Sequence, residues 1–86
     1  MKIDMNSKLE LQQAKDYEIH SKGAKGQVHY QVDGLPKGVK LDGDRIHVDG
    51  DAQPGTHTIR VRATDEKGEV DERIITLVIM LHEVEA

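Results

Sequence analysis

Four aspartates lie within ten residues in the stretch DGDRIHVDGD, and carboxylates are ligands that calcium prefers. The stretch lacks the Asp-x-Asp-x-Asp-Gly-x5-Glu spacing of an EF-hand loop. Asp42 and Asp44 belong to one turn, whereas Asp49 and Asp51 follow the next strand. A five-residue strand separates these two pairs by roughly 16 Å, which is too far for one ion. We therefore interpret the aspartates as turn residues.

Histidine is the other residue type that could bind a metal here. The five histidines are His20, His29, His47, His57 and His82. They form no i, i+2 or i, i+4 pair, and the strand pattern places His29 and His47 on different sheets, so no convergence is expected. The chain has no cysteine, which excludes disulfides and thiolate ligands. The sequence thus predicts no metal centre built on histidine.

Catalytic signatures are also missing from the sequence. Ser7 and Ser21 lie outside any Gly-x-Ser-x-Gly elbow, and there is no cysteine nucleophile. Asp and Glu together number 16, so carboxylate pairs occur everywhere and carry no information about a site. We expect neither enzymatic activity nor a cofactor.

Length and charge narrow the class of protein further. The 86 residues fit one small domain. A net charge of −4 and the lack of a basic stretch with aromatics argue against nucleic-acid binding. No stretch approaches the ~20 apolar residues of a membrane span, so membrane insertion is not expected. The start, MKIDMNSK, has no apolar core of a signal peptide. The compartment stays open: cytoplasmic if Met1 is native, extracellular or at the cell surface if the domain belongs to a longer chain.

Apolar residues recur with a period of two, which predicts strands. The pattern covers residues 28–32, 39–41, 46–48, 59–63 and 75–81, with the last strand placing Ile75, Leu77, Ile79 and Leu81 on one face. Residues 7–20 are ambiguous. They could form a helix capped by Ser7, but Tyr17 and Ile19 do not share a helical face with Leu9, and we favour two short strands.

Turn residues separate these strands at short intervals. Pairs such as Asp33-Gly34, Asp42-Gly43 and Lys67-Gly68 supply the positive φ that tight turns need. LDGDRI and ATDEKGEVDERI therefore predict two hairpins. About seven short strands without a long helix indicate an all-β, antiparallel sandwich.

The order of several short motifs is similar to that of a known family. YQVDGLPKGVKLD is followed by IHVDG, then by PGTHTIRVRATDEKG and ITLVI. Over about residues 17–81 this series resembles the putative-immunoglobulin and dystroglycan-type cadherin-like domains. The resemblance implies an immunoglobulin-like β-sandwich of about seven strands with a non-enzymatic role. We expect one domain over residues 1–86, with its core at about 7–82 and a flexible segment at 1–6.

The resemblance also raises calcium as a weak candidate ligand. In cadherins an aspartate in an Ala-x-Asp-x-x-Gly-like segment helps to bind calcium between successive domains, and Asp65 occupies the matching position. The other cadherin calcium motifs are missing: there is no Leu-Asp-Arg-Glu segment, and no Asp-x-Asn-Asp-Asn linker follows Leu81. We therefore favour a structural role for Asp65, which would initiate the turn and accept hydrogen bonds from local N–H groups.

A surface is the stronger functional indication. In an immunoglobulin-like sandwich the third, sixth and seventh strands share one sheet. Its outer face would carry His29, Arg60, Arg62, Ile74, Val78 and Met80. Because the last strand is then apolar on both faces, something should cover it: another protomer, a neighbouring domain or the N-terminal segment. Alternatively, Leu9 or Leu11 and the arginine stems cover it.

These observations predict a non-catalytic module for protein–protein association, in adhesion or scaffolding. Its partner would be another protein, a neighbouring domain or a second copy in a homo-oligomer. A module that binds carbohydrate or a surface polymer is one alternative, although only Tyr17 and Tyr30 could stack on a sugar and both are expected to point inward. An intracellular structural domain is the other.

Overall fold

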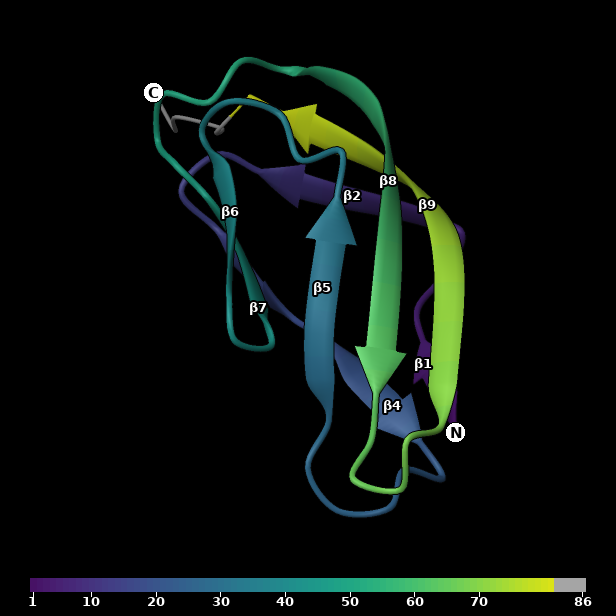
Figure 1. The fold of residues 1–86 in the computed structure, drawn as a ribbon. Helices are drawn as coiled ribbons and strands as arrows, with labels where there is room; N and C mark the ends of the chain where they lie inside the picture. Colours follow the sequence, from purple (N-terminus) through teal and green to yellow (C-terminus); the bar gives the residue numbers. More distant parts are fainter. Residues whose placement is uncertain (82–86) are drawn as a thin grey trace.

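Nine strands and no helix make up residues 1–81, the part of the chain that the computed structural model describes (Figure 1). Within these residues no helix could cross a membrane. The strands are β1 (Lys2–Asp4), β2 (Lys8–Gln12), β3 (Asp16–Glu18), β4 (His20–Lys22), β5 (His29–Asp33), β6 (Val39–Asp42), β7 (Arg45–Val48), β8 (Gly55–Thr64) and β9 (Val70–Met80). The end of the expected core at residue 82, and with it His82, lies outside the described residues.

The strands form two layers, as the sequence pattern predicted. One layer is a four-stranded sheet in the order β2-β9-β8-β5. The other layer consists of the pair β1-β4 and the sheet β3-β7-β6. This is the arrangement of an immunoglobulin-like sandwich, in which the first, second, fifth and fourth strands face the third, sixth and seventh. Nine segments replace the expected seven because the first strand is divided into β1 and β2, and the second into β3 and β4.

The N-terminal segment differs from the expectation in two ways. Residues 1–6 were expected to be flexible, but β1 pairs with β4, Ile3 is fully buried and Met5 is 7% exposed. The chain then crosses to the other layer, where β2 pairs with β9 in parallel, from Lys8 beside Thr76 to Gln12 beside Met80. An antiparallel pattern alone does not predict this parallel pair. The helix considered for residues 7–20 does not form.

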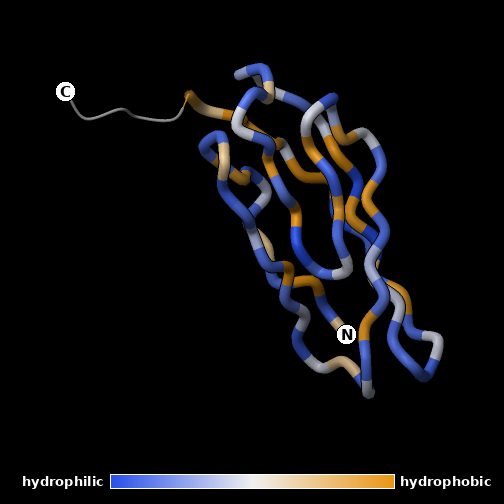
Figure 2. Tube along the Cα trace, turned by 90° about the vertical axis from the view of Figure 1, so that its left-hand side faces the viewer, coloured by the Kyte–Doolittle hydropathy of each residue, from blue (hydrophilic) through white to orange (hydrophobic). Residues whose placement is uncertain are grey.

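Val, Ile and Leu make up most of the core between the layers, as the scarcity of aromatics requires. Hydrophobic and hydrophilic residues alternate along the strands (Figure 2). Fully buried positions alternate along the long strands at Ile59 and Val61 in β8 and at Ile75 and Leu77 in β9. The period-two pattern therefore predicted the inward face correctly over most of its length. It was wrong at Leu81, which is 68% exposed because β9 ends at Met80.

Both predicted hairpins are present. Gly43 lies in the turn between β6 and β7, and Glu66–Gly68 connects β8 to β9. The segment between β5 and β6 is a corner. Leu35 packs against the core while the Pro36 carbonyl accepts a 3.1 Å hydrogen bond from the Val39 N–H. The Gly-Leu-Pro-Lys-Gly element thus positions the start of β6.

Candidate interaction surface

The outer face of the four-stranded sheet brings together side chains from β5, β8 and β9 that are far apart in the sequence. Cross-strand registers place Arg62 between Gln31 and Glu72, and Arg60 between Asp33 and Ile74. We call this side the outer face, and define it by His29, Gln31, Asp33, Thr56, Thr58, Arg60, Arg62, Val70, Glu72, Ile74, Thr76, Val78 and Met80. All six residues of the predicted interaction face belong to it.

These six residues nevertheless do not form one patch. Arg60 is the direct neighbour of Ile74, but Val78 lies beside Thr56 and Glu10, and Met80 lies beside Gln12. Eight residues separate Glu72, the neighbour of Arg62, from Met80 along β9, which is about 27 Å at the usual rise of a strand. The outer face therefore has an arginine-rich end near His29 and a separate apolar end near Met80.

Strand β2 lies beside β9 in the same sheet and borders the apolar end of the outer face. Leu11 is buried and Leu9 packs against the core, so neither shields the outer face as the sequence interpretation allowed. The polar side chains of Lys8, Glu10 and Gln12 flank β9 instead, and Val78 and Met80 are only half-exposed. The exposed apolar side chains of the sheet lie further along β9, where Ile74 is 57% and Val70 46% exposed.

Only some of the charged side chains of the outer face form ion pairs among the described residues. Arg62 makes an ion pair with Glu72 at 3.6 Å, and both side chains are about half exposed. Arg60 makes no ion pair within 4 Å among residues 1–81. Beside it lies a shallow hollow of about 320 Å³ lined by Asp33, Gly34, Thr58, Ile59, Arg60 and Ile74. A larger open hollow of about 670 Å³, which includes His29, Gln31 and Arg62 in its lining, occupies the end near the β8–β9 turn.

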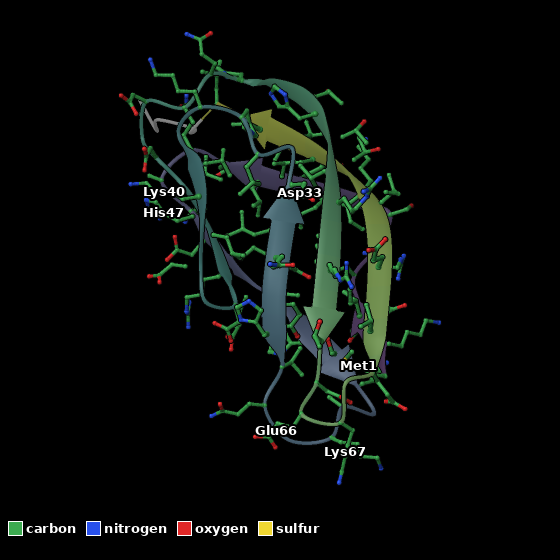
Figure 3. The ribbon with its side chains drawn as sticks, viewed as in Figure 1. Met1, Asp33, Lys40, His47, Glu66 and Lys67 are labelled. Carbon is green, nitrogen blue, oxygen red and sulfur yellow. The ribbon has the colours of Figure 1, made fainter. Side chains whose placement is uncertain are left out.

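The opposite layer presents a very different exterior. Its outward side chains are mostly charged and paired with one another, as between Lys22 and Asp4 at 3.9 Å or Arg45 and Glu18 at 3.7 Å. The β6–β7 hairpin carries Lys40 and His47, both labelled in Figure 3. The two exteriors of the sandwich thus differ in chemistry: one is a dense set of ion pairs, and the other mixes threonine, arginine and exposed apolar groups.

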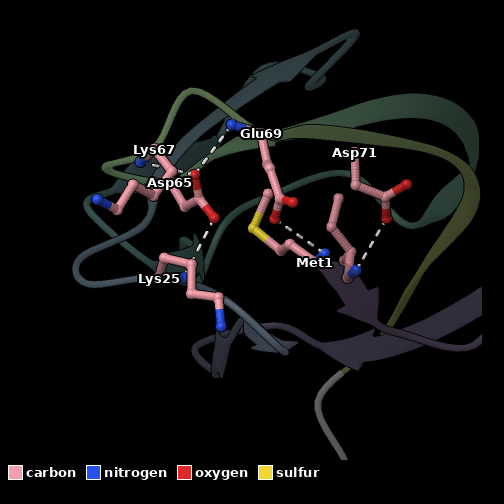
Figure 4. A network of polar contacts seen from close by, with 7 residues as sticks. Met1, Lys25, Asp65, Lys67, Glu69 and Asp71 are labelled. Carbon is pink, nitrogen blue, oxygen red and sulfur yellow. Dashed lines mark hydrogen bonds and ion pairs between the residues drawn. The ribbon is translucent and has the colours of Figure 1, made fainter.

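Asp65 is the buried acidic residue of the described chain, at the start of the β8–β9 turn (Figure 4). Its Oδ2 accepts a 3.1 Å hydrogen bond from the Lys25 N–H, and its Oδ1 accepts bonds of 2.9 Å from the N–H groups of Lys67 and Glu69. Burial alone would raise the pKa of Asp65, but the N–H donors at Lys25, Glu69 and Lys67 outweigh it and lower the pKa. The carboxylate joins the turn to the loop that precedes β5.

We expect calcium titration at millimolar concentration and low ionic strength to give no binding heat. Three N–H groups point their positive ends at the Asp65 carboxylate, and calcium needs six to eight oxygen ligands instead. Among residues 1–81 no group of three or more acidic, histidine or cysteine side chains could hold a metal. Isothermal calorimetry is the measurement, and a saturable heat that Asp65→Asn removes would contradict the prediction.

Asp65→Asn should lower the melting temperature at neutral pH, with the difference from wild type shrinking in acid. The amide keeps one acceptor oxygen but turns its NH₂ toward an N–H donor. Because the folded pKa lies below the ordinary 3.8, the carboxylate stabilises the fold above that value, and this contribution is lost as pH falls through the lower folded pKa. Melting curves across the acid range measure this. A constant difference at all pH values would contradict it.

His47 lies between two carboxylates on the opposite layer. Its Nδ1 hydrogen-bonds Asp16 Oδ1, and its Nε2 is 3.2 Å from Asp49 Oδ1. The hydrogen bond to Asp16, helped by the negative charges of Asp16 and Asp49, raises the pKa of His47 above 6.5, although desolvation and Lys40 oppose the shift. Asp16 and His47 are cross-strand neighbours between β3 and β7, so their contact depends on a register that local patterns do not reveal.

Wild type should lose stability relative to His47→Gln as pH rises from about 6 into the alkaline range. A histidine with a raised folded pKa contributes stability fully below its ordinary value of 6.5, and this contribution disappears as pH passes through the folded pKa. Melting temperatures of both proteins over this range test the prediction. His20→Gln, a change at another exposed histidine, is the matched control, and parallel curves for His47→Gln and wild type would contradict it.

Sequence reasoning missed two kinds of residue on these surfaces. Asp33 and the threonines of β8 had no motif, yet the β5–β8–β9 register places Asp33 and Thr58 beside Arg60. The Asp16–His47 pair bridges residues 31 apart. A correct assignment of strand partners would have found both, because side chains opposite each other in neighbouring strands share one face.

Comparison with known proteins agrees with this architecture. The chain superposes on a solved structure described as "GspB Siglec domain" with a TM-score of 0.54 and 12% sequence identity, covering 94% of this chain and 57% of that chain. This likeness concerns the fold, and the chain spans little more than half of its neighbour's length. No curated protein matches the chain.

A family model gives the assignment that the motifs suggested. The model described as "Putative Ig domain" matches residues 5–80, nearly the whole described chain. Immunoglobulin-like families are generally non-catalytic and commonly bind proteins or surfaces. The two-layer topology, the fold neighbour and the extent of the match lead to one conclusion: the chain belongs to the Putative Ig domain family and has an immunoglobulin-like β-sandwich fold.

Proposed function

We propose that this domain is a non-catalytic module that docks onto another protein through its outer face, with Ile74 and Arg60 at the centre of the contact. The observation that carries the proposal is the pairing of these two side chains across β8 and β9. Ile74 is 57% exposed, and its neighbour Arg60 has no ion pair among residues 1–81. Apolar side chains and arginines are enriched where protein interfaces concentrate their binding energy.

The surroundings of Ile74 suit a protein partner. Thr58 and Thr76 are opposite each other in the next row of the β8–β9 ladder and can donate or accept hydrogen bonds without a charge. Asp33 and the hollow of about 320 Å³ border the same site. A partner could therefore bury an apolar side chain against Ile74 and place a carboxylate near Arg60. The wider family's role in protein or surface binding supports this proposal.

The opposite layer is a poorer docking surface. Several of its charged side chains are already paired, as with Arg45 and Glu18 or Lys22 and Asp4. A partner that covered them would have to desolvate these charges, and the interaction gained often only compensates for that cost. The contrast between the two exteriors favours the outer face.

Carbohydrate binding receives less support from the structure. Sugar rings stack on exposed aromatic side chains, and the chain has two tyrosines and no tryptophan or phenylalanine. Tyr30 is only 7% exposed, with its hydroxyl 2.8 Å from the Ser21 hydroxyl. Tyr17 is half-buried.

A comparison of two charge-reversed variants tests the docking proposal. Arg60→Glu/Arg62→Glu alters the outer face, and Lys22→Glu/Arg45→Glu makes the same change of charge on the opposite layer. Each immobilised protein is exposed to an extract of the source organism, and captured proteins are quantified by mass spectrometry. The proposal expects a protein held by wild type and by the control, and reduced about tenfold or more on the outer-face variant. Equal loss on both variants, or loss on the control alone, would contradict it.

A further inference from the structure

Strand β5 is an open edge of the four-stranded sheet. Its neighbour is β8 on one side, and no strand of residues 1–81 pairs with its other side (Figure 1). Outside the β5–β8 ladder, β5 makes no backbone hydrogen bond to any described residue. A strand of five residues therefore presents a row of N–H and C=O groups that only water satisfies.

The residues of β5 do nothing to block this edge. Edge strands are commonly protected by lysine, proline or a bulge. The sequence HYQVD has none of these, and its ladder with β8 is continuous from His29 to Asp33. The other edges are different: β6 carries Lys40, and β2 carries Lys8 and Glu10. Strand β5 is thus an edge without lysine, proline or a bulge, unlike β2 and β6.

The sequence of β5 is also complementary to itself. If two copies pair antiparallel about a two-fold axis at Gln31, His29 of each copy lies opposite Asp33 of the other. Tyr30 then lies opposite Val32, and the two Gln31 amides face each other. Basic–acidic and aromatic–branched cross-strand pairs stabilise a sheet. The same operation on β2 would oppose Glu10 to Glu10, which is unfavourable.

We propose that β5 is a self-association edge, through which two copies of this chain join their four-stranded sheets into one continuous sheet of eight strands. The occupant is a second copy because the His29–Asp33 complementarity occurs twice in a symmetric pair. Asp33 lies at the end of β5, clear of the β6–β7 hairpin (Figure 3). His29, Gln31 and Asp33 are exposed, whereas Tyr30 is already buried and needs no movement.

This pairing uses the β5 edge rather than the Ile74–Arg60 contact, and a dimer would carry two docking sites. Arg62 is the cross-strand neighbour of Gln31, so the outer faces of the two copies would meet at their arginine-rich ends. A dimer would then present two Ile74–Arg60 sites on one continuous surface, and a partner with two binding segments would gain affinity from the second.

Charge exchange at the edge tests the proposal by sedimentation equilibrium at concentrations up to about 1 mM. Wild type should approach twice the monomer mass of 9.6 kDa as concentration rises. His29→Asp places a carboxylate opposite Asp33 of the other copy at both ends of the paired strands. This repulsion should weaken association about tenfold or more. Asp33→Lys removes both attractive pairs and should also weaken it. An equimolar mixture of the two variants should associate again. In the mixed pair the aspartate introduced at position 29 lies opposite the lysine introduced at position 33, and the native Asp33 lies opposite the native His29.

Lys40→Asp, on the edge of the other sheet, is the control and should associate as wild type does. Thermal melting verifies that each variant is folded, since Asp33→Lys places a second cation beside Arg60. A wild type that stays monomeric throughout the range overturns the proposal, and so does a dimer that His29→Asp leaves intact. Failure of the mixture to recover association also overturns it. His29→Asp leaves Ile74, Arg60 and Asp33 in place, so a loss of self-association in this variant is distinguishable from a loss of docking.

Discussion

Gly34→Ala is expected to lower the free energy of unfolding by about 3 kcal/mol, which corresponds to a fall in melting temperature of roughly 12–24 °C. Gly34 has φ of 89°, where a side chain is strained, and an added Cβ would be 2.7 Å from the carbonyl oxygen of Thr58. That oxygen belongs to the backbone of β8, so relief requires a shift of the corner or of the sheet. Chemical denaturation at neutral pH measures the change.

Gly43→Ala is the matched control for this prediction. Gly43 also has a positive φ, of 63°, but an added Cβ meets nothing within 4 Å. The change should therefore cost only the backbone strain, about 1 kcal/mol. The difference between the variants isolates the close approach of the corner to β8. Equal losses of unfolding free energy in the two variants would show that backbone conformation alone requires glycine at position 34. That result would contradict the clash with Thr58.

The corner illustrates what the sequence could predict. Pro36 restricts Leu35 to an extended conformation, and the structure has Leu35 against the core. Such local rules also predicted both hairpins and the inward faces of β8 and β9. Each depends on residues within a few positions of one another, so the chain itself contains the information.

Features that depend on pairing between distant strands were not predictable in the same way. The parallel contact of β2 with β9 joins Leu9 to Leu77, and nothing local to either strand specifies it. The same reason applies to Asp16 beside His47, and to the separation of Met80 from Arg60 on the outer face. Sequence reasoning assigned the six residues of the predicted interaction face to the sheet and the side on which the structure has them. It overestimated how close its residues lie, because strand direction and register set those distances.

The N-terminal segment shows the largest difference between expectation and structure. Its short pattern, KIDM, is too brief to display a period, and the sequence alone therefore predicts a flexible segment. In the structure the Ile3 N–H donates a 2.8 Å hydrogen bond to Asp71 Oδ2, and the Ile3 carbonyl accepts one of 3.3 Å from Arg73 Nη1. Two side chains of β9 thus take the place of a backbone ladder on one side of β1, while β4 pairs with the other side. Strand β1 thereby connects the two layers at their edge.

Ile3→Ala should consequently cost about 3 kcal/mol of unfolding free energy, because it leaves a cavity at a fully buried position. That is a large share of the roughly 4–13 kcal/mol expected for a domain of this size. Leu81→Ala is the control at the other end of the chain. The period-two pattern assigned Leu81 to the core, but it is 68% exposed, and its truncation should change stability by less than about 0.5 kcal/mol. Urea unfolding of both variants measures these two changes. If the N-terminus were flexible and Leu81 lay in the core, as the sequence pattern suggests, Leu81→Ala would be the more destabilising change.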